Sequence, residues 1–437
     1  MSLLSLQQDI QAAITEEKKK PRTKRDQDAL DDLQDARWHA RHLGDAFAWL
    51  LFKLDRQKIL SLGNNSRVPV VQPGHGYQGM ISIATALANN GWGFPLLHDI
   101  SDCLRIGDIT FIRPDQEPSY VTVEVKTRLL SEAPNDDGSK TLRYETKVLS
   151  QYQMDIESGG VVGEVDLSLK PPEPPRERID RQAERMRTAL LRARASDGMI
   201  DGLDEPTLSL NVSLGTKSHW DVLKRLIREA HTSCYAGAAV DKAAFYSVFY
   251  RKGGIEVETV QDPRFLDDLT KSDFMHSSDP EERALIIYAV PHPREDQPYE
   301  TLPYFLFPLP RRAIFEILSH ELMIMVHINP GHVCDRLRSE GFDIEVRPQQ
   351  SGPSEIVVID TFTSDSGRPL RTEAHIVAHV LRQSVGEFHS LDFLVGMTRH
   401  MVEASREHAR TGALQKLPSS QGPAATQMSP LRAIPIT

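Results

Sequence analysis

Two acidic residues and a lysine, Asp108, Glu124 and Lys126, lie in a segment that has the sequence pattern of a β-hairpin. Residues 107–113 form its first arm and residues 119–126 its second. The second arm alternates, with valines at one set of positions and Glu124 and Lys126 at the other. This period of two predicts a half-buried strand with both charged side chains on one face.

The expected register brings two like charges together. If the turn places Arg113 opposite Ser119, Asp108 lies opposite Glu124 with the Cβ atoms about 4.5–5.5 Å apart, and such a pair destabilises a sheet. A divalent cation would remove this repulsion, because Mg²⁺ prefers one or two carboxylates and water. The alternative is a surface strand with a salt bridge, since Glu-x-Lys spacings also occur elsewhere, at Glu16, Glu17 and Glu145.

The segments Ile106–Ile109 and Val123–Lys126 resemble the PD-(D/E)XK nuclease superfamily, which includes restriction enzymes, junction resolvases and phage-defence effectors. The resemblance covers residues 35–195. It implies an α/β fold, with a restriction-endonuclease-like mixed central sheet flanked by helices, and a metal-dependent hydrolase of DNA phosphodiester bonds.

The resemblance also implies roles for individual residues. Asp108 and Glu124 would bind Mg²⁺ or Mn²⁺, Val125 would add its backbone carbonyl, and Lys126 would face the attacking water or the phosphate. A metal ion lowers the pKa of bound water and neutralises the charge that grows on the phosphate in the transition state.

Two further catalytic candidates follow from the family pattern of an acidic residue on the preceding helix and a glutamine on the following one. Asp45 and Gln182 are the best matches. The family more usually has glutamate at the first position, so a catalytically inactive nuclease fold that binds nucleic acid or acts as a scaffold is the alternative function. The long gap between Lys126 and Gln182 indicates an insertion across residues 130–175.

A helix expected over residues 177–195 carries a basic stripe. Its arginines recur at spacings of three, four and seven, which places them along one face: Arg178, Arg181, Arg185 and Arg192. The stripe could bind nucleic-acid phosphates; a solvated face balanced by neighbouring acidic residues is the alternative.

Composition limits the class of protein. The 437 residues are 40% hydrophobic and 26% charged, as in ordinary globular chains. Three widely spaced cysteines give no disulfide or zinc pattern, and there is no long apolar run, so we expect a cytoplasmic protein without membrane contact. Residues 1–198 hold 27 Lys and Arg against 29 Asp and Glu (−2), which leaves 24 against 32 (−8) for the rest and places the acidic excess away from the hairpin.

The chain is expected to divide into four parts: a charged N-terminal arm (1–35), the nuclease domain (36–198), an α+β domain for sensing, specificity or assembly (199–410), and a disordered tail (411–437). Helices are expected near residues 35–58 and 80–89.

The second half mixes strand and helix periodicities. Strands are expected near 207–214, 255–260, 284–290 and 356–362, and helices near 218–232, 311–327, 372–384 and 391–409. His375 and His379 would stand one turn apart on the third of these helices, so a histidine-based metalloenzyme is a further alternative. An ordinary exposed or buried pair of histidines is the competing interpretation.

The biological role is inferred by analogy. A nuclease domain joined to an acidic α+β domain, with no phosphate-binding loop of an ATPase, resembles bacterial antiviral defence or restriction effectors. Such effectors act on DNA and are released by a trigger or by a regulatory protein partner, and a homo-oligomer is compatible with this role. The choice between DNA and RNA stays open at this point.

Overall fold

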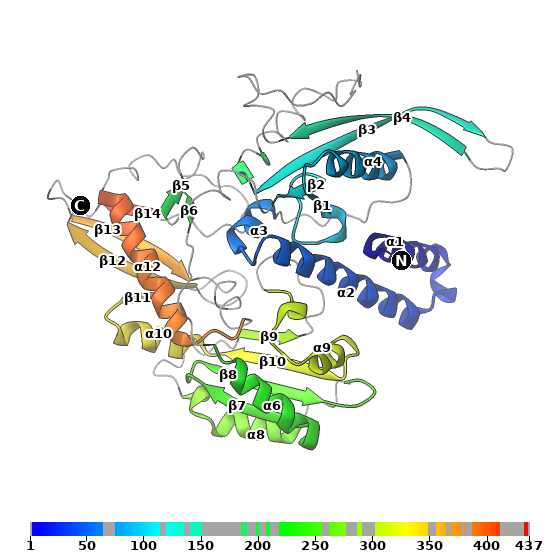
Figure 1. Cartoon of the computed structure of the whole chain (residues 1–437). Helices are drawn as coiled ribbons and strands as arrows, with labels where there is room; N and C mark the ends of the chain where they lie inside the picture. The colour runs from blue at the N-terminus through cyan, green and yellow to red at the C-terminus, as the bar shows by residue number, and fades with distance from the viewer. Residues whose placement is uncertain are drawn as a thin grey trace. The chain divides into compact units, whose positions relative to one another are not determined.

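The computed structural model (Figure 1) describes a defined set of segments. They are residues 2–63, 75–113, 119–134, 140–150, 185–186, 188–189, 198–200, 207–209, 218–255, 262–276, 286–290, 302–347, 355–363, 367, 369–376, 381, 387–410 and 432–435. The chain divides into two compact units. Unit 1 comprises Met1–Arg194 with Asp296–Tyr299, and unit 2 comprises Ala195–Glu295 with Glu300–Thr437.

Unit 1 begins with helices α1 (Leu3–Lys19), α2 (Gln27–Leu51), α3 (Arg56–Leu62) and α4 (His75–Asn89). The first three start at side-chain caps. Ser2, Asp26 and Asp55 each accept a hydrogen bond from the backbone N–H three residues further on. These bonds satisfy donors that the first turn of a helix leaves unpaired.

The charged arm expected over residues 1–35 is instead built of helix. The α1 residue Gln7 is fully buried, and its amide donates to the backbone carbonyls of Ala40 and Ile100, both at 2.9 Å. The prediction was wrong because it followed the dense charge of residues 16–25 and gave too little weight to the apolar positions of α1, of which Ile14 is buried.

The sheet of unit 1 is an antiparallel meander in the order β1-β2-β3-β4. Its strands are β1 (Phe94–Leu97), β2 (Ile109–Ile112), β3 (Tyr120–Pro134) and β4 (Lys140–Ser150), and the short 3₁₀ helix η2 (His98–Ile100) follows β1. Helix α4 covers the apolar face of the hairpin, where Met80, Ile83 and Leu87 pack with Phe111 and Val123. The core of unit 1 therefore fixes which face of the hairpin carries the polar residues.

The first sheet of unit 2 has the order β7-β8-β10-β9. Its strands are β7 (Tyr235–Val240), β8 (Ala244–Tyr250), β9 (Ile286–Val290) and β10 (Leu322–Ile328), with helices α6 (Trp220–Ser233), α8 (Pro263–Lys271) and α9 (Arg311–Leu318). Tyr250 of β8 contacts His231 of α6, whereas Phe245 and Phe249 contact Phe265 of α8. Since neighbouring strand residues point to opposite faces, α6 and α8 cover opposite sides of the sheet.

The second sheet of unit 2 has the order β11-β12-β13-β14. Its strands are β11 (Asp343–Arg347), β12 (Glu355–Thr363), β13 (Pro369–Ile376) and β14 (Arg432–Pro435), packed with helices α10 (Pro330–Ser339) and α12 (Leu391–Arg410). A small two-stranded sheet is formed by β5 (Gly198–Ile200) and β6 (Thr207–Ser209).

Three expectations for unit 2 are corrected. The helix expected over 311–327 stops at Leu318, and Leu322–Ile328 is the central strand β10, because a short apolar run has no period that separates a buried strand from a helix. A helix was expected over residues 372–384, but residues 372–376 belong to strand β13. Within the tail expected to be disordered, residues 432–435 form β14, which pairs with β13, and the other residues of the tail lie outside the described residues.

The fold class is mixed helix and sheet. Every strand pairing in the part of the chain that the structure describes is antiparallel. The mixed sheet expected for residues 36–198 is therefore not seen among those residues, since β1 to β4 follow one another without the long crossover that a parallel pair requires.

Candidate active site

The β2–β3 hairpin adopts the register expected from its alternation. Ile109 pairs with Val123 and Ile112 with Tyr120, and the Arg113 N–H donates to the Ser119 carbonyl at 2.7 Å. The even-numbered residues from Tyr120 to Lys126 therefore share the face opposite α4.

Asp108 lies immediately before the first residue of β2 and departs from the regular ladder. Its N–H donates to the Val123 carbonyl at 2.8 Å, and its carboxylate accepts the Val125 N–H at 2.6 Å. The preceding Gly107 has φ +83°, and a Cβ there would lie 2.5 Å from a methyl carbon of Thr122. Glycine is thus required at this position, and its turn lets the Asp108 side chain replace a backbone carbonyl as the partner of β3.

Glu124 and Lys126 lie on the same face of β3, as expected, and form an ion pair. Glu124 is 8% exposed, whereas the Lys126 side chain is 29% exposed. Val125 lies between them on the other face, and its N–H is directed at Asp108. Because the N–H and C=O of one strand residue point toward the same neighbour, the Val125 carbonyl lies on the Asp108 side of β3.

The pKa of the Asp108 carboxyl group is raised toward neutral pH. Burial, followed by the negative charge of Glu124, raises the pKa of Asp108 to about 7, against the opposing effects of the Val125 hydrogen bond and Lys126. A carboxyl group with such a pKa exchanges its proton near neutral pH, which is a frequent property of functional sites.

Three buried polar side chains, His98, Thr110 and Thr122, form a chain of close contacts on the face of the sheet that carries Glu124. His98 Nε2 lies 2.7 Å from Thr110 Oγ1, which lies 2.9 Å from Thr122 Oγ1. Burial lowers the pKa of His98 to about 3, so its imidazole is neutral at physiological pH. His98 was not predicted from the sequence; the signal for it was a threonine on each hairpin arm, two residues from Asp108 and Glu124 respectively.

Asp45 does not lie free on the exposed face of α2. It is 1% exposed, and its Oδ1 accepts hydrogen bonds from Ser101 Oγ (2.9 Å), Asp102 N (2.6 Å) and Cys103 N (2.8 Å). A Cβ on the neighbouring Gly44 would lie 1.7 Å from the Ile100 carbonyl oxygen, so the glycine permits this close approach of helix and loop. The structure thus gives Asp45 the task of holding the loop that leads to β2.

We expect Asp45→Asn to keep both the fold and any cleavage activity, because an amide oxygen can accept the same three hydrogen bonds. Asp45→Ala should lower the free energy of unfolding by about 3 kcal/mol, since it leaves buried donors unpaired. Urea denaturation and DNA cleavage of both variants test this. A folded but inactive Asp45→Asn would instead assign Asp45 to catalysis, as the sequence suggested.

Of the remaining candidate residues predicted from the sequence in the nuclease domain, the structure describes only Arg185. Gln182, Arg178, Arg181 and Arg192 lie outside the described residues. Arg185 is exposed in a helical segment in which Met186 and Ala189 are buried.

The alternative histidine site is corrected in part. His375 lies on strand β13, where its Nδ1 is 3.0 Å from Glu355 and its Nε2 is 3.7 Å from Glu373; His379 lies outside the described residues. Among the residues that the structure describes, no group of three or more His, Cys, Asp or Glu side chains is arranged to hold a metal ion. In those same segments no helix has the length and apolarity to cross a bilayer.

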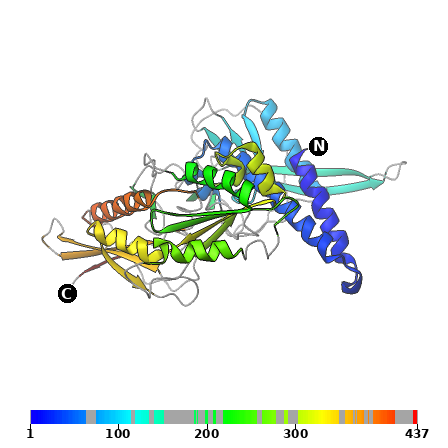
Figure 2. The same ribbon diagram turned by 90° about the horizontal axis from the view of Figure 1, so that it is seen from below.

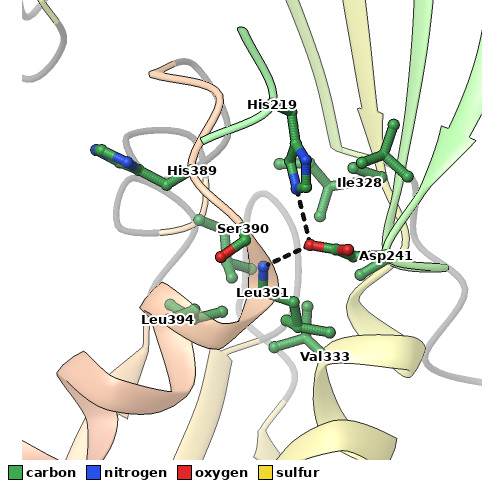
Figure 3. A pocket seen from close by; sticks show the side chains of 12 residues that line it. His219, Asp241, Ile328, Val333, His389, Ser390, Leu391 and Leu394 are labelled. Atoms are coloured by element: carbon green, nitrogen blue, oxygen red, sulfur yellow. Dashed lines mark hydrogen bonds and ion pairs between the residues drawn. The ribbon is translucent and has the colours of Figure 1, made fainter. Parts of the chain in front are cut away.

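A pocket lies in unit 2 (Figure 3). Its lining is mainly aliphatic, and its polar edge has His219 Nε2 at 2.7 Å from Asp241, which also accepts the Leu391 N–H at 3.0 Å. The Ser390 hydroxyl points away from the His219 ring (Figure 3). Asp241 therefore ties the β7–β8 turn to the start of α12, and the described residues that line the pocket place no nucleophile beside the histidine.

Comparison of the chain with protein-family models, with curated proteins and with solved structures finds no match.

Proposed function

We propose that unit 1 is a metal-dependent nuclease of restriction-endonuclease-like type that hydrolyses phosphodiester bonds of DNA. The observation that carries this proposal is the position of Asp108 immediately before β2, beside Glu124 and bonded to the Val125 N–H. Two acidic residues are adjacent here, partly buried, with a lysine next to them. A sheet without a functional demand would avoid such a pair.

The donor set suits Mg²⁺ or Mn²⁺. Two carboxylates and a backbone carbonyl are oxygen ligands, and Mg²⁺ commonly completes its coordination with water and substrate phosphate. Asp108, Glu124 and the Val125 carbonyl would hold the ion, which supplies an acidified water and neutralises charge on the phosphate. The turn at Gly107 directs the Asp108 carboxylate toward β3, where it could serve as the first of these ligands.

Lys126 has a separate task in this proposal. Its ammonium group lies beside Glu124 and is more exposed than that carboxylate, so it can reach toward a scissile phosphate or hydrogen-bond to the attacking water. A fixed cation in a partly dehydrated site stabilises developing negative charge more strongly than it would in water.

The direct test is cleavage of plasmid and linear DNA by the purified full chain with Mg²⁺ or Mn²⁺, and with EDTA. We expect cleavage only with metal, and a loss of about a hundredfold or more in Glu124→Ala, as for removal of a group that stabilises transition-state charge. Equal cleavage by wild type and Glu124→Ala would show that the site is wrongly assigned.

A second candidate function is supported by the position of Asp45. Because Asp45 is engaged with the loop at 101–103, the described site has two carboxylates and no third from α2. A nuclease-like fold that binds nucleic acid without cutting it fits this count. It predicts salt-dependent DNA binding with no metal requirement, and metal-dependent cleavage in the assay above would exclude it.

The proposed setting, an antiviral defence or restriction effector with a trigger or regulatory partner, rests on the family resemblance alone.

A further inference from the structure

Helix α2 turns an apolar stripe outward at its C-terminal end. Phe47 is 47% exposed and Leu50 is 54% exposed, and Leu54, just after the helix, is 51% exposed. Other sides of the same turns bury Asp45 and Trp49. A helix on the surface of a domain normally buries its apolar stripe and exposes its polar residues, so this stretch has the reverse arrangement.

Helix α1 does not cover the stripe. It runs antiparallel to α2, because Gln11 Oε1 accepts a hydrogen bond from Arg37 at 3.1 Å and the Gln7 amide donates to the Ala40 carbonyl. Since α1 begins four residues before Gln7, its contacts with α2 end about one turn beyond Ala40. Figures 1 and 2 show α1 beside the N-terminal part of α2 only, with both helices in blue. Phe47 and the residues after it lie beyond the end of α1.

The backbone after α2 holds Leu54 in a strained conformation. Lys53 and Leu54 have φ of +57° and +60°, in the left-handed region that glycine and asparagine adopt more readily than leucine. The Leu54 N–H donates to the Trp49 carbonyl at 2.7 Å, so the turn keeps Leu54 against the last turn of α2. Because half of this side chain is exposed, packing within unit 1 gives no reason for a leucine at a strained position.

The spacing of the stripe suits a second helix. Leu43, Phe47, Leu50 and Leu54 recur at intervals of four, three and four residues, which is the spacing of helices that pack side by side. The exposed residues between positions 46 and 54 include one charged residue, Lys53. The stripe therefore has no charge pattern that would select a partner of opposite charge.

An identical helix matches this stripe without any further requirement. In an antiparallel pair about a two-fold axis next to Leu50, Phe47 lies against Leu54 of the second copy, so each end of the stripe covers the other. The same axis places the two Lys53 residues about 8 Å apart along the helices, which avoids direct contact between like charges.

The exposed area is large enough to matter for a dimer. With about 200 Å² for a whole side chain, Phe47, Leu50 and Leu54 expose on the order of 300 Å² in one copy, or about 600 Å² in a pair. A stable interface buries about 1,600 Å² in total, of which a little more than half is apolar. These three residues would thus supply about two-thirds of the apolar area that such an interface contains.

We propose that the stripe of Phe47, Leu50 and Leu54 is the contact surface of a homodimer, in which α2 packs antiparallel against α2 of a second copy of the chain. None of these residues belongs to the proposed metal site. The inference therefore stands or falls separately from the nuclease function.

The first test is the mass of the full chain in solution. Sedimentation velocity across the micromolar range compares wild type with Leu50→Glu, and circular dichroism shows whether each variant is folded. Leu266→Glu is the matched control, because Leu266 on α8 is a leucine of similar exposure, 57%, outside the stripe.

We expect wild type and Leu266→Glu to form dimers. Leu50→Glu should raise the dissociation constant by about a hundredfold or more, since it places two carboxylates in an apolar contact. A wild-type chain that stays monomeric throughout would overturn the proposal and leave the stripe to a different partner. Equal dimerisation of Leu50→Glu and Leu266→Glu would overturn it as well.

The second test examines the two-fold axis. Leu50→Cys is prepared in a Cys234→Ser background, because Cys234 is exposed whereas the other two cysteines are buried. Mild oxidation should link Leu50→Cys into a covalent dimer, since the two copies of this residue lie next to the axis. Leu266→Cys in the same background should stay largely unlinked. Equal linking of the two variants would show random collision and overturn the antiparallel pair.

Discussion

Lys126→Met is expected to reduce metal-dependent DNA cleavage by about a hundredfold or more, because it removes the cation beside Glu124 while keeping an apolar chain of similar length. The same substitution should not weaken metal binding. A carboxylate released from its ion pair attracts Mg²⁺ at least as well as before, so the affinity for the ion should stay equal or rise. Cleavage rates and Mn²⁺ titration of the same preparation measure the two quantities.

A matched control separates this from the loss of an ordinary ion pair. Lys58 also lies in unit 1 and pairs with Asp55 at 2.9 Å, three residues away on α3. Lys58→Met should cost less than about 1 kcal/mol in stability and leave cleavage unchanged, as for most exposed pairs. If Lys126→Met behaved like Lys58→Met, Lys126 would be a surface ion pair, which is the alternative that the sequence left open.

The hairpin could be predicted from the sequence because its determinants are local. Alternating valines define the buried face of β3, and the turn length fixes the partner of Arg113. Both follow from residues within the hairpin. The departure of Asp108 from the ladder could not be read in this way, since it depends on the left-handed backbone of Gly107 packed against Thr122.

The role of Asp45 shows where sequence reasoning stops. Its three donors come from residues 101–103, more than fifty positions later in the chain. Helical periodicity places Asp45 on α2 but cannot say which loop covers it. His98 is a similar case, because its contact with Thr110 arises only when β1 and β2 pair.

The errors in unit 2 have one physical cause. Leu322–Ile328 and Pro369–Ile376 are central strands, and each contains three consecutive buried residues, so both faces are covered there. Central strands therefore carry weak alternation and can match a helical pattern over a short window. His375 was assigned to a helix on that basis, and its observed neighbours Glu355 and Glu373 come from the sheet itself.

Asp108→Asn is expected to raise the stability of the folded protein. The pKa of Asp108 is raised to about 7 in the folded protein, above the value near 4 of an unfolded chain. Between these values the folded state holds a proton that the unfolded state has lost, so stability falls as pH rises and levels off above 7. At lower pH both states are protonated and the contribution of Asp108 is fully favourable.

Asparagine removes this penalty because it is neutral and its amide oxygen can still accept the Val125 N–H. At pH 8 without metal, Asp108→Asn should stabilise the hairpin by about 2 kcal/mol, less than the full pKa difference implies because Asp108 and Glu124 titrate together. At pH 4 the two proteins should be nearly equal. Hydrogen exchange of the β2–β3 amides localises the measurement to unit 1, which matters because the chain has two units.

Added Mg²⁺ should make the wild-type hairpin more stable than that of Asp108→Asn. Saturating Mg²⁺ at pH 8 binds the wild-type carboxylates and should slow exchange in the wild-type hairpin, with little effect in Asp108→Asn, because a ligand stabilises only the state that binds it. Asp55→Asn is the control, since asparagine caps a helix as well as aspartate does and α3 should be unaffected by pH or metal. A site that is less stable without its ion and inactive when stabilised is the behaviour expected of residues kept for catalysis. If Asp108→Asn loosened the hairpin at pH 8, the carboxylate would be structural and the metal site would have to be abandoned.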